Sequence, residues 1–334
     1  MVARIKQNIL VTGGGGFLGK AIVRRLVESG ENVRSFSRRF YPELKSMGVD
    51  QIQGDIGDNS EVIKACNGIQ TVFHVAAKPG VWGNYKDYYK TNVSGTKNVI
   101  EACNNHHISK LVYTSSPSVV FNGMDMEGVD ESVPYPDHFH AHYPKTKAIA
   151  EQLVVSASTD KLRTIILRPH LIWGPEENNF VPRIIAKAGW LKIVGNGRNL
   201  VDTVYIDNAA DAHILAAENL DKNPDISGNV YFISQDEPVL LWGLINAILK
   251  AAGLEPVKGS IPKQMAWLLG TAFEFLYKVL HIKKEPPMTR FVAEELATSH
   301  WFDISAARRD LGYSPRVSTE EGLRLLENWL KNKK

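Results

Sequence analysis

The stretch Thr12-Gly13-Gly14-Gly15-Gly16-Phe17-Leu18-Gly19 decides the fold of this 334-residue chain. It joins a short apolar run, Asn8–Thr12, to a segment with helical periodicity that ends at Gly30, so we predict a buried strand followed by a helix. In such a unit one glycine permits a tight turn, a second lets the backbone approach a pyrophosphate, and a third packs the helix on the sheet. Gly13, Gly16 and Gly19 have that spacing. A flexible glycine turn is the simpler alternative, but the strand–loop–helix context favours a dinucleotide site at the helix N-terminus.

Strand and helix patterns alternate through the first half of the chain, which predicts a parallel sheet covered on both faces. The fold class we expect is α/β, a Rossmann-type doubly wound sheet with a smaller C-terminal substrate region. Residues 1–169 would form the NAD(P)-binding domain, completed by segments near 200–235, and residues 170–334 would mainly bind substrate. We predict the remaining strands at 32–37, 51–54, 71–77, 110–115, 163–168 and 228–234, and helices at 17–29, 61–66, 88–104 and from 143.

Composition indicates an ordinary globular protein, with 44% apolar and 22% charged residues and a net charge of +3. No run of Lys and Arg interleaved with aromatic residues occurs, so we expect no nucleic-acid partner. Cys66 and Cys103 lack ligand spacing, which predicts free thiols in a reducing cytosol and no metal site. Residues 1–7 run directly into a strand pattern without a signal peptide, and no apolar stretch is long and clean enough to span a bilayer. We therefore expect a cytoplasmic protein.

The end of the second predicted strand bears on the choice of cofactor. An Asp or Glu there would accept a hydrogen bond from the adenosine 2′-hydroxyl of NAD, but this strand ends in Phe36-Ser37-Arg38-Arg39. Two guanidinium groups suit a 2′-phosphate, so NADP(H) is favoured and NAD(H) is the alternative. Exposed arginines without a ligand would explain the same residues. Asp55, at the end of the third predicted strand, is expected near the adenine.

Tyr143 and Lys147 are four residues apart and share one face of a predicted helix, whose first turn accommodates Pro144. A free tyrosine titrates near ~10, and a neighbouring cation stabilises its phenolate. Lys147 would supply that charge and also bind the nicotinamide ribose. Ser116, after the fifth predicted strand, would polarise a substrate oxygen while Tyr143 transfers the proton. A surface helix is the better interpretation of the Tyr-x-x-x-Lys pattern alone, but here three features coincide.

This set resembles the extended branch of the short-chain dehydrogenase/reductase superfamily, through TGGGGFLG, Ser116, YPKTK, Leu167-Arg168-Pro169 and Val204-Tyr205-Ile206-Asp207. Within it the chain is similar to the 3β-hydroxysteroid dehydrogenase group, and particularly to bacterial 2-alkyl-3-oxoalkanoate reductases. The resemblance implies that Ser116, Tyr143 and Lys147 are catalytic and that Asn92 supports the active-site helix or a proton relay. The cofactor residues that we expect are Gly13, Gly16, Phe17, Leu18, Gly19, Ser37, Arg38, Arg39, Asp55, Ile56, Ala76, Ala77, Lys78, Asn92, Tyr143, Lys147 and Pro169.

The implied reaction is NADP(H)-dependent interconversion of a 3-oxo and a 3-hydroxy group on a lipid-like or steroid-like substrate. We expect Lys78, Trp82, Ser116 and Trp173 to contact it. Two other functions stay open: a sugar-nucleotide epimerase or dehydratase, which uses the same Tyr, Lys and Ser, and a non-catalytic NADP(H)-binding sensor. The apolar character of Trp82, Trp173 and residues 265–280 argues against the first, and the intact catalytic set against the second.

Two further segments have more than one interpretation. His138, His140 and His142 precede Tyr143 and are interpreted as a loop over the active site, because their spacing lacks an accompanying Cys or acidic cluster. Residues 265–280 are strongly apolar and are followed by basic residues up to 284. They fit a core helix or substrate lid, an oligomer contact such as a homodimer interface, or an interfacial helix in peripheral contact with a membrane.

Overall fold

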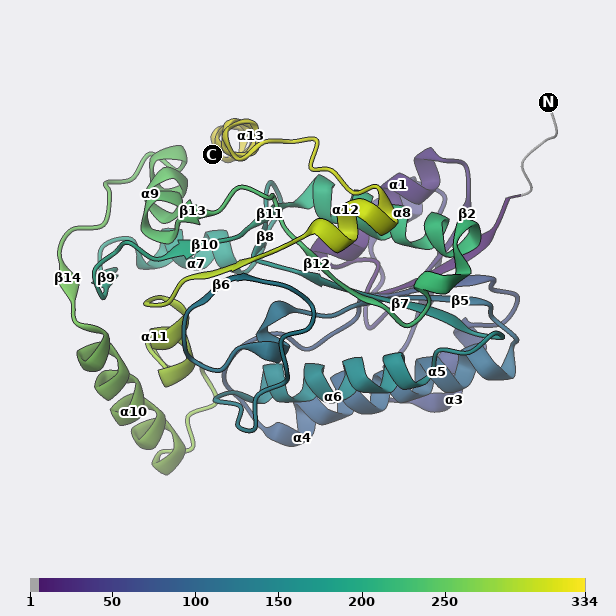
Figure 1. Ribbon diagram of the computed structural model, residues 1–334, viewed down its shortest axis with the longest axis horizontal. Helices are drawn as coiled ribbons and strands as arrows, with labels where there is room; N and C mark the ends of the chain where they lie inside the picture. The colour runs from purple at the N-terminus through teal and green to yellow at the C-terminus, as the bar shows by residue number, and fades with distance from the viewer. Residues whose placement is uncertain (1–5, 334) are drawn as a thin grey trace.

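The computed structural model describes residues 6–333, so residues 1–5 of the predicted N-terminal approach and Lys334 lie outside the described chain. Its centre is a seven-stranded sheet in the order β12-β7-β5-β4-β1-β2-β3, in which every pairing is parallel (Figure 1). The strands are β1 (Asn8–Thr12), β2 (Asn32–Ser37), β3 (Asp50–Gln53), β4 (Thr71–His74), β5 (Lys110–Thr114), β7 (Arg163–Pro169) and β12 (Val230–Ile233).

Helices cover both faces of this sheet, because its strands are apolar on both sides. Leu10 and Val11 are adjacent in β1 and enter two different cores. In Figure 1, α3, α5 and α6 cover one face, and α1, α8 and α12 the other. Their bounds are α1 (Phe17–Glu28), α3 (Asn59–Ala65), α5 (Gly95–Asn105), α6 (His142–Ser156), α8 (Ile206–Lys222) and α12 (Ser305–Leu311), and the short α2 (Pro42–Ser46) and α4 (Tyr85–Tyr88) follow β2 and precede α5.

The strand order reverses direction between β1 and β4, which creates a crevice beyond their carboxyl ends. The glycine loop follows β1 there, and residues 75–78 follow β4. The glycine loop and residues 75–78 therefore lie on opposite sides of this crevice, as the predicted Rossmann-type fold requires.

The chain after β7 builds a second region and also returns to the central sheet. β12 pairs with β7, whereas β15 (His300–Phe302) pairs with β6 (Met126–Val129) from the first half of the chain. The two regions therefore exchange strands. The other elements of this region are α7 (Phe180–Lys187), α9 (Leu241–Ala251), α10 (Lys263–Val279), α11 (Arg290–Glu295), α13 (Thr319–Asn332), β8 (Ile172–Trp173), β9 (Ile193–Val194), β10 (Leu200–Val201), β11 (Val204–Tyr205), β13 (Val239–Leu240) and β14 (Ser260–Ile261).

Two predicted elements differ from those observed. β4 ends at His74 and not at Ala77, because the N–H groups of Val75 and Ala76 donate to the Thr12 hydroxyl rather than to a neighbouring strand. The predicted helix over 88–104 is three pieces: α4, a π-helical turn at Tyr89–Ser94, and α5. Within residues 6–333, no helix combines the length and the apolar character needed to cross a bilayer.

Candidate active site

The glycine loop forms a cradle that side chains would fill. Gly13 has φ +70°, and a Cβ there would lie 3.0 Å from Ala76 Cα. A Cβ on Gly19 would lie 2.2 Å from the Gly13 carbonyl oxygen, so α1 packs directly on the turn. Gly15, which the sequence pattern did not single out, faces Tyr41, and a Cβ on Gly15 would lie 2.1 Å from Cε2 of that ring. α1 begins without a side-chain cap, so its first N–H groups are available to an anion, as the pyrophosphate of a dinucleotide requires.

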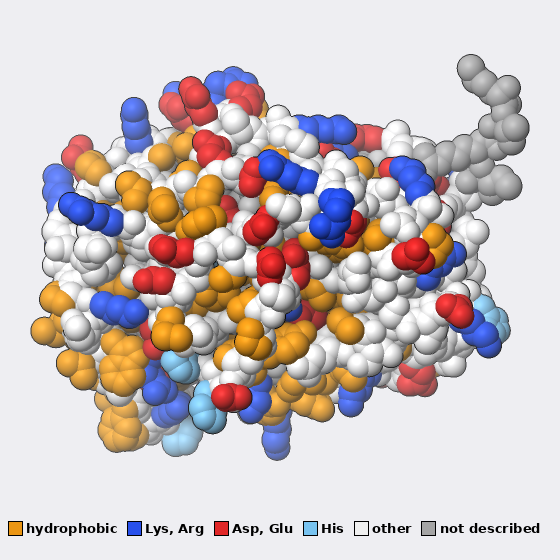
Figure 2. All heavy atoms as spheres, viewed as in Figure 1, with side chains coloured by type: hydrophobic (Ala, Val, Ile, Leu, Met, Phe, Trp, Pro, Cys, Tyr) orange, Lys and Arg blue, Asp and Glu red, His pale blue; other side chains and the backbone are white. Residues whose placement is uncertain are grey.

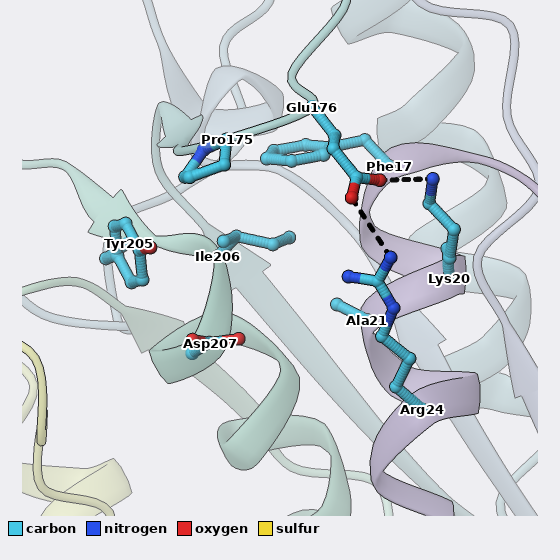
Figure 3. A pocket seen from close by; sticks show the side chains of 9 residues that line it. All are labelled: Phe17, Lys20, Ala21, Arg24, Pro175, Glu176, Tyr205, Ile206 and Asp207. Atoms are coloured by element: carbon cyan, nitrogen blue, oxygen red, sulfur yellow. Dashed lines mark hydrogen bonds and ion pairs between the residues drawn. The ribbon is translucent and has the colours of Figure 1, made fainter. Parts of the chain in front are cut away.

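Two cations on α1 anchor the glycine-loop helix to the C-terminal region. Lys20 and Arg24 both form ion pairs with Glu176, and the Arg24 Nη2 to Glu176 Oε1 distance is 3.0 Å (Figure 3). Burial would raise the pKa of Glu176, but the hydrogen bonds from the two cations outweigh it and lower that pKa. The small pocket beside them, of about 170 Å³, is lined by Phe17 and by the start of α8 at Ile206.

Tyr143 and Ser116 come together at the carboxyl end of β5. Ser116 follows that strand and caps a 3₁₀ turn by accepting the Ser118 N–H, and its hydroxyl hydrogen-bonds Tyr143. Burial raises the pKa of Tyr143 to about 12, although the bond with Ser116 and the nearby carboxyl of Glu295 act in opposite directions. Tyr143 is therefore a protonated phenol at neutral pH, whereas we had expected Lys147 to lower its pKa.

Lys147 lies deep in the protein, and its ammonium group is held by other partners. Nζ donates to the Tyr113 hydroxyl at 2.6 Å and to the Thr114 carbonyl at 2.6 Å. Burial lowers the pKa of Lys147 to about 7, while Glu151, one turn further along α6, raises it. Glu151 in turn forms a buried ion pair with Arg168, with Nη2 to Oε1 at 2.6 Å, and accepts from Tyr135 at 2.7 Å. Sequence analysis missed Tyr113 and Glu151, although Tyr143, Lys147 and Glu151 share one helical face.

A chain of buried hydrogen bonds connects Lys147 to the glycine loop. The Tyr113 hydroxyl bonds Thr96, whose Oγ1 lies 3.0 Å from His74 Nε2. His74 Nδ1 lies 2.8 Å from the Thr12 hydroxyl, which already accepts two backbone N–H groups and must donate its own hydrogen. Burial, followed by the Lys147 charge, lowers the pKa of His74 to about 3, so this ring is neutral and carries its proton on Nε2.

Asn92 ties the loop after β4 to the catalytic helix. It lies in the π-helical turn, where its Oδ1 accepts the Lys78 N–H at 2.7 Å. Its Nδ2 donates to Thr146 Oγ1 at 3.0 Å, on α6 between Tyr143 and Lys147. Such π-helical turns are common at functional sites, and this geometry supports the predicted positioning role of Asn92.

Arg38 and Arg39 are exposed at the carboxyl end of β2, and neither forms an ion pair with a carboxylate of the described chain. The adjacent Asp55 instead pairs with Lys90 at 2.6 Å, and this bond is the largest cause of its lowered pKa. Two unpaired guanidinium groups thus lie beside the crevice.

A cavity of about 850 Å³ opens next to the residues that precede Tyr143. Its apolar wall includes Trp82, Phe139 and Tyr277, and Trp82 and Tyr277 meet edge to face at 6.2 Å. Lys78, Lys278 and Lys283 also line this cavity, together with the carboxylate residues Asp87 and Glu274. The cavity joins the loop at 78–84 to the end of α10, two segments about 200 residues apart in the sequence.

Trp173, which we expected to contact the substrate, lies elsewhere. Trp173 is completely buried in the core, where its Nε1 donates to Thr203 at 3.1 Å, so the structure places it away from the cavity that Trp82 lines. His140 and His142, by contrast, both line that cavity. His142 is the first residue of α6 and packs against Tyr85, while His140 bonds Glu294 at 2.5 Å. Within residues 6–333, no three His, Cys, Asp or Glu side chains are grouped to hold a metal ion.

The parallel sheet, the glycine cradle and the Ser116, Tyr143 and Lys147 cluster define an NAD(P)-dependent oxidoreductase of the extended short-chain dehydrogenase/reductase type. The family model of the 3-beta hydroxysteroid dehydrogenase/isomerase family matches residues 10–263, and the chain belongs to this family. The predicted fold class and enzyme class are thereby confirmed.

The alignments with related proteins cover nearly the whole chain. A 2-alkyl-3-oxoalkanoate reductase of Stenotrophomonas maltophilia is 50% identical over 96% of this chain and 98% of its own length. A decarboxylating sterol-4-alpha-carboxylate 3-dehydrogenase of Mus musculus is 35% identical over 95% and 89%. Among solved structures, MoeE5 in complex with UDP-glucose and NAD has a TM-score of 0.75 and 26% identity, with 98% of this chain and 99% of that chain covered.

The close packing of the glycine loop predicts how much a side chain at Gly13 lowers the free energy of unfolding. Gly13→Ala forces a side chain into a left-handed backbone conformation and against Ala76, whereas Gly30→Ala, at φ +84°, meets no atom within 4 Å. We expect Gly30→Ala to cost about 1–2 kcal/mol from backbone strain and Gly13→Ala clearly more. Urea unfolding measures both free energies. Equal losses would show that the contact with Ala76 does not constrain the loop.

Proposed function

We propose that this enzyme interconverts a 3-oxo and a 3-hydroxy group on a lipid-like substrate of the 2-alkyl-3-oxoalkanoate or 3β-hydroxysteroid type, with NADP(H) as cofactor. The observation that carries the proposal is the pairing of Ser116 with Tyr143, next to a cavity that the residues just before Tyr143 line together with aromatic and charged side chains. The names of the relatives with 50% and 35% identity support the same substrate class.

The residues at the crevice fit a dinucleotide. The cradle from Gly13 to Gly19 and the uncapped start of α1 would hold the pyrophosphate, and Ser37, Arg38 and Arg39 the adenosine 2′-phosphate. Asp55, Ile56, Ala76, Ala77 and Pro169 end neighbouring parallel strands or follow them, and complete the proposed site together with Phe17 and Leu18. When bound, the nicotinamide supplies or accepts the hydride.

Side chains of the protein donate the proton and stabilise the developing charge. In reduction, oxygen gains negative charge as the hydride arrives, and a hydrogen bond from Ser116 stabilises it. Tyr143 then donates its phenolic proton to that oxygen. A pKa of about 12 keeps this proton in place at neutral pH, the form required for reduction. Lys147 is the cation of the cluster, and the bonds to Tyr113 and Thr114 fix its position.

The cavity suits an amphiphilic anion. Trp82, Phe139 and Tyr277 offer apolar surface to an alkyl chain or ring system, and Lys78 offers a charge to a carboxylate. A sugar-nucleotide epimerase is the rival function, because MoeE5 was solved with UDP-glucose and NAD. The identity to MoeE5 is 26%, whereas the identity to the 2-alkyl-3-oxoalkanoate reductase is 50%, and the aromatic side chains of Trp82, Phe139 and Tyr277 in the cavity also favour the lipid-like substrate.

We also propose that different parts of the chain bind the cofactor and the substrate. Residues 1–169, with segments near 200–235 that include β12, would hold the cofactor, and residues 170–334 would mainly shape the substrate region. Cys66 and Cys103 are free and buried, which is compatible with the reducing cytoplasm in which we place the enzyme.

The catalytic roles are tested by single substitutions. Tyr143→Phe should lower kcat by about 100- to 10,000-fold because the proton donor is lost, with NADPH affinity retained. Lys147→Ala should weaken both cofactor binding and turnover, and Ser116→Ala mainly turnover. Stopped-flow NADPH oxidation and fluorescence titration measure the two quantities. Near-normal turnover in Tyr143→Phe would remove this residue from the mechanism, and a non-catalytic sensor would show no turnover even in the wild type.

Cofactor choice is tested at the end of β2. Arg38→Ser/Arg39→Ser should raise the Kd of NADPH about tenfold or more through loss of charge-assisted bonds to the 2′-phosphate, and leave that of NADH nearly unchanged. Arg198→Ser, an exposed arginine between β9 and β10, is the matched control. Wild-type protein that binds both cofactors equally would contradict the NADP(H) preference.

Substrate choice is tested with 3-oxo acids of increasing length, alongside 3-oxosteroids and UDP-sugars. Each methylene buried in the cavity should raise kcat/KM about fourfold until the cavity is full. Lys78→Ala should penalise a free acid more than its methyl ester, whereas Lys97→Ala on the exposed face of α5 should affect neither. Flat efficiency across chain lengths would contradict the apolar cavity as a substrate site, and turnover of a UDP-sugar alone would establish the epimerase.

A further inference from the structure

Helix α10 turns its polar side toward the protein and its apolar side outward, which is the reverse of an ordinary surface helix. The side that it turns toward the protein carries small or polar residues, Ala266, Gly270 and Glu274, at successive turns. A Cβ on Gly270 would lie 2.7 Å from the Arg290 backbone nitrogen, so α10 packs closely on the start of α11. Glu274 accepts from the Arg290 backbone N–H at 2.8 Å and from its Nε at 3.0 Å. The contact with the protein is thus polar and tight.

The outward side of α10 is formed by large apolar side chains, which we call the apolar face. Phe275 is 70% exposed and Leu268 58% exposed, values that a core helix would not show. Figure 2 shows hydrophobic side chains gathered at the lower left, where Figure 1 places α10, with blue and pale-blue groups next to them. The apolar face consists of Met265, Leu268, Leu269, Phe275, Leu276, Val279 and Leu280. Trp267 is turned back toward the protein, where its Nε1 donates to Glu294 at 3.1 Å.

Cations surround the apolar face. Lys263 begins the helix, Lys278 lies in its last turn, and Lys283 and Lys284 follow the helix. None of these four lysines forms an ion pair with a carboxylate in the described chain. Glu274 is the sole carboxylate within residues 263–284 and is already paired with Arg290, while the next one, Glu285, is paired with Arg183. The segment itself therefore carries an excess of positive charge at the edges of the apolar face, while Asp87 shares the neighbouring cavity with Lys278 and Lys283.

We propose that α10 docks on the surface of an anionic lipid bilayer, with its axis in the membrane plane and the apolar face inserted among the acyl chains. A helix with one apolar side and flanking lysines binds such surfaces through apolar burial and attraction to anionic headgroups. Its 17 residues make it about 26 Å long, too short and too interrupted to span the bilayer.

A second copy of this chain fits the apolar face less well. A two-fold axis that pairs α10 with its symmetry mate in antiparallel fashion brings Lys263 near Lys278 of the mate. A parallel pairing brings each lysine near its own equivalent. In both arrangements lysines of one copy would lie beside lysines of the other, and the apolar face holds no free carboxylate to pair with them. Like charges that face each other across an interface are unfavourable. A bilayer with anionic headgroups provides the complementary charge.

The docked helix also adjoins the substrate cavity. Tyr277, Lys278 and His281 line that cavity, and the Ile282 carbonyl accepts from Trp82 Nε1 at 3.2 Å. If the enzyme acts on a lipid-like compound as proposed above, the bilayer would deliver the substrate beside the cavity mouth. This second consequence rests on the proposed function, whereas docking itself does not.

Vesicle flotation with the full-length protein tests docking without any substrate. Wild-type protein should float with phosphatidylglycerol vesicles and far less with phosphatidylcholine vesicles, and added salt should weaken binding. Leu268→Glu/Phe275→Glu should reduce the vesicle affinity at least tenfold, and Lys284→Gln about fivefold. The matched controls are Val155→Glu and Lys97→Gln on the exposed faces of α6 and α5, which should bind as the wild type does.

Folding of the variants is checked by NADPH affinity, which the apolar-face substitutions should leave unchanged. Absence of wild-type binding to phosphatidylglycerol vesicles, or equal binding by the double variant, would overturn the proposal. A wild-type dimer that the double variant converts to monomer, without vesicle binding, would assign the face to a second copy instead. Retained vesicle binding without turnover of any 3-oxo lipid would overturn the proposed substrate class alone.

Discussion

Burial of the Lys147 ammonium group is the constraint on which the site depends. A charge in the protein interior is unfavourable unless other groups replace its water, and the lowered pKa of Lys147 records that cost. Tyr113 and Thr114 at the end of β5 provide the replacement, and Glu151 adds a compensating negative charge one helical turn away. Because these partners come from a central strand and from α6, catalytic geometry requires the sheet and helix to be in register.

The same constraint extends from Lys147 to the glycine loop. Thr96 and His74 continue the hydrogen bonds from Tyr113 to Thr12, the residue that leads into the glycine cradle. Each group in this chain is buried, so each needs its partner, and displacement of one would leave another unsatisfied. The loop for the cofactor and the helix bearing Tyr143 are therefore positioned by one continuous network rather than by two independent ones.

Local patterns explain what could be predicted from the sequence. The glycine loop and the first strands depend on residues adjacent in the chain, and the Tyr143 and Lys147 pair on one helical turn. Partners distant in sequence were missed: Glu295 lies near Tyr143 from α11, and the cavity joins Trp82 to Ile282. Aromatic character alone also placed Trp173 with the substrate, but β8 turns it into the core. Which side of a strand faces a cavity depends on segments that local patterns do not specify.

Helix α10 illustrates the limit of hydrophobic periodicity most clearly. Its sequence favours a core helix or a substrate lid over an interfacial helix, but periodicity shows that one side is apolar without showing what covers it. The decisive information is tertiary: Gly270 allows close approach to α11, and Glu274 is held by Arg290, so the polar side faces inward. The apolar side is then left outward beside the lysine-bearing cavity. A helix whose polar groups are bonded to its own protein has only apolar surface left for its surroundings, and that surface is the basis of the lipid-bilayer contact that we propose.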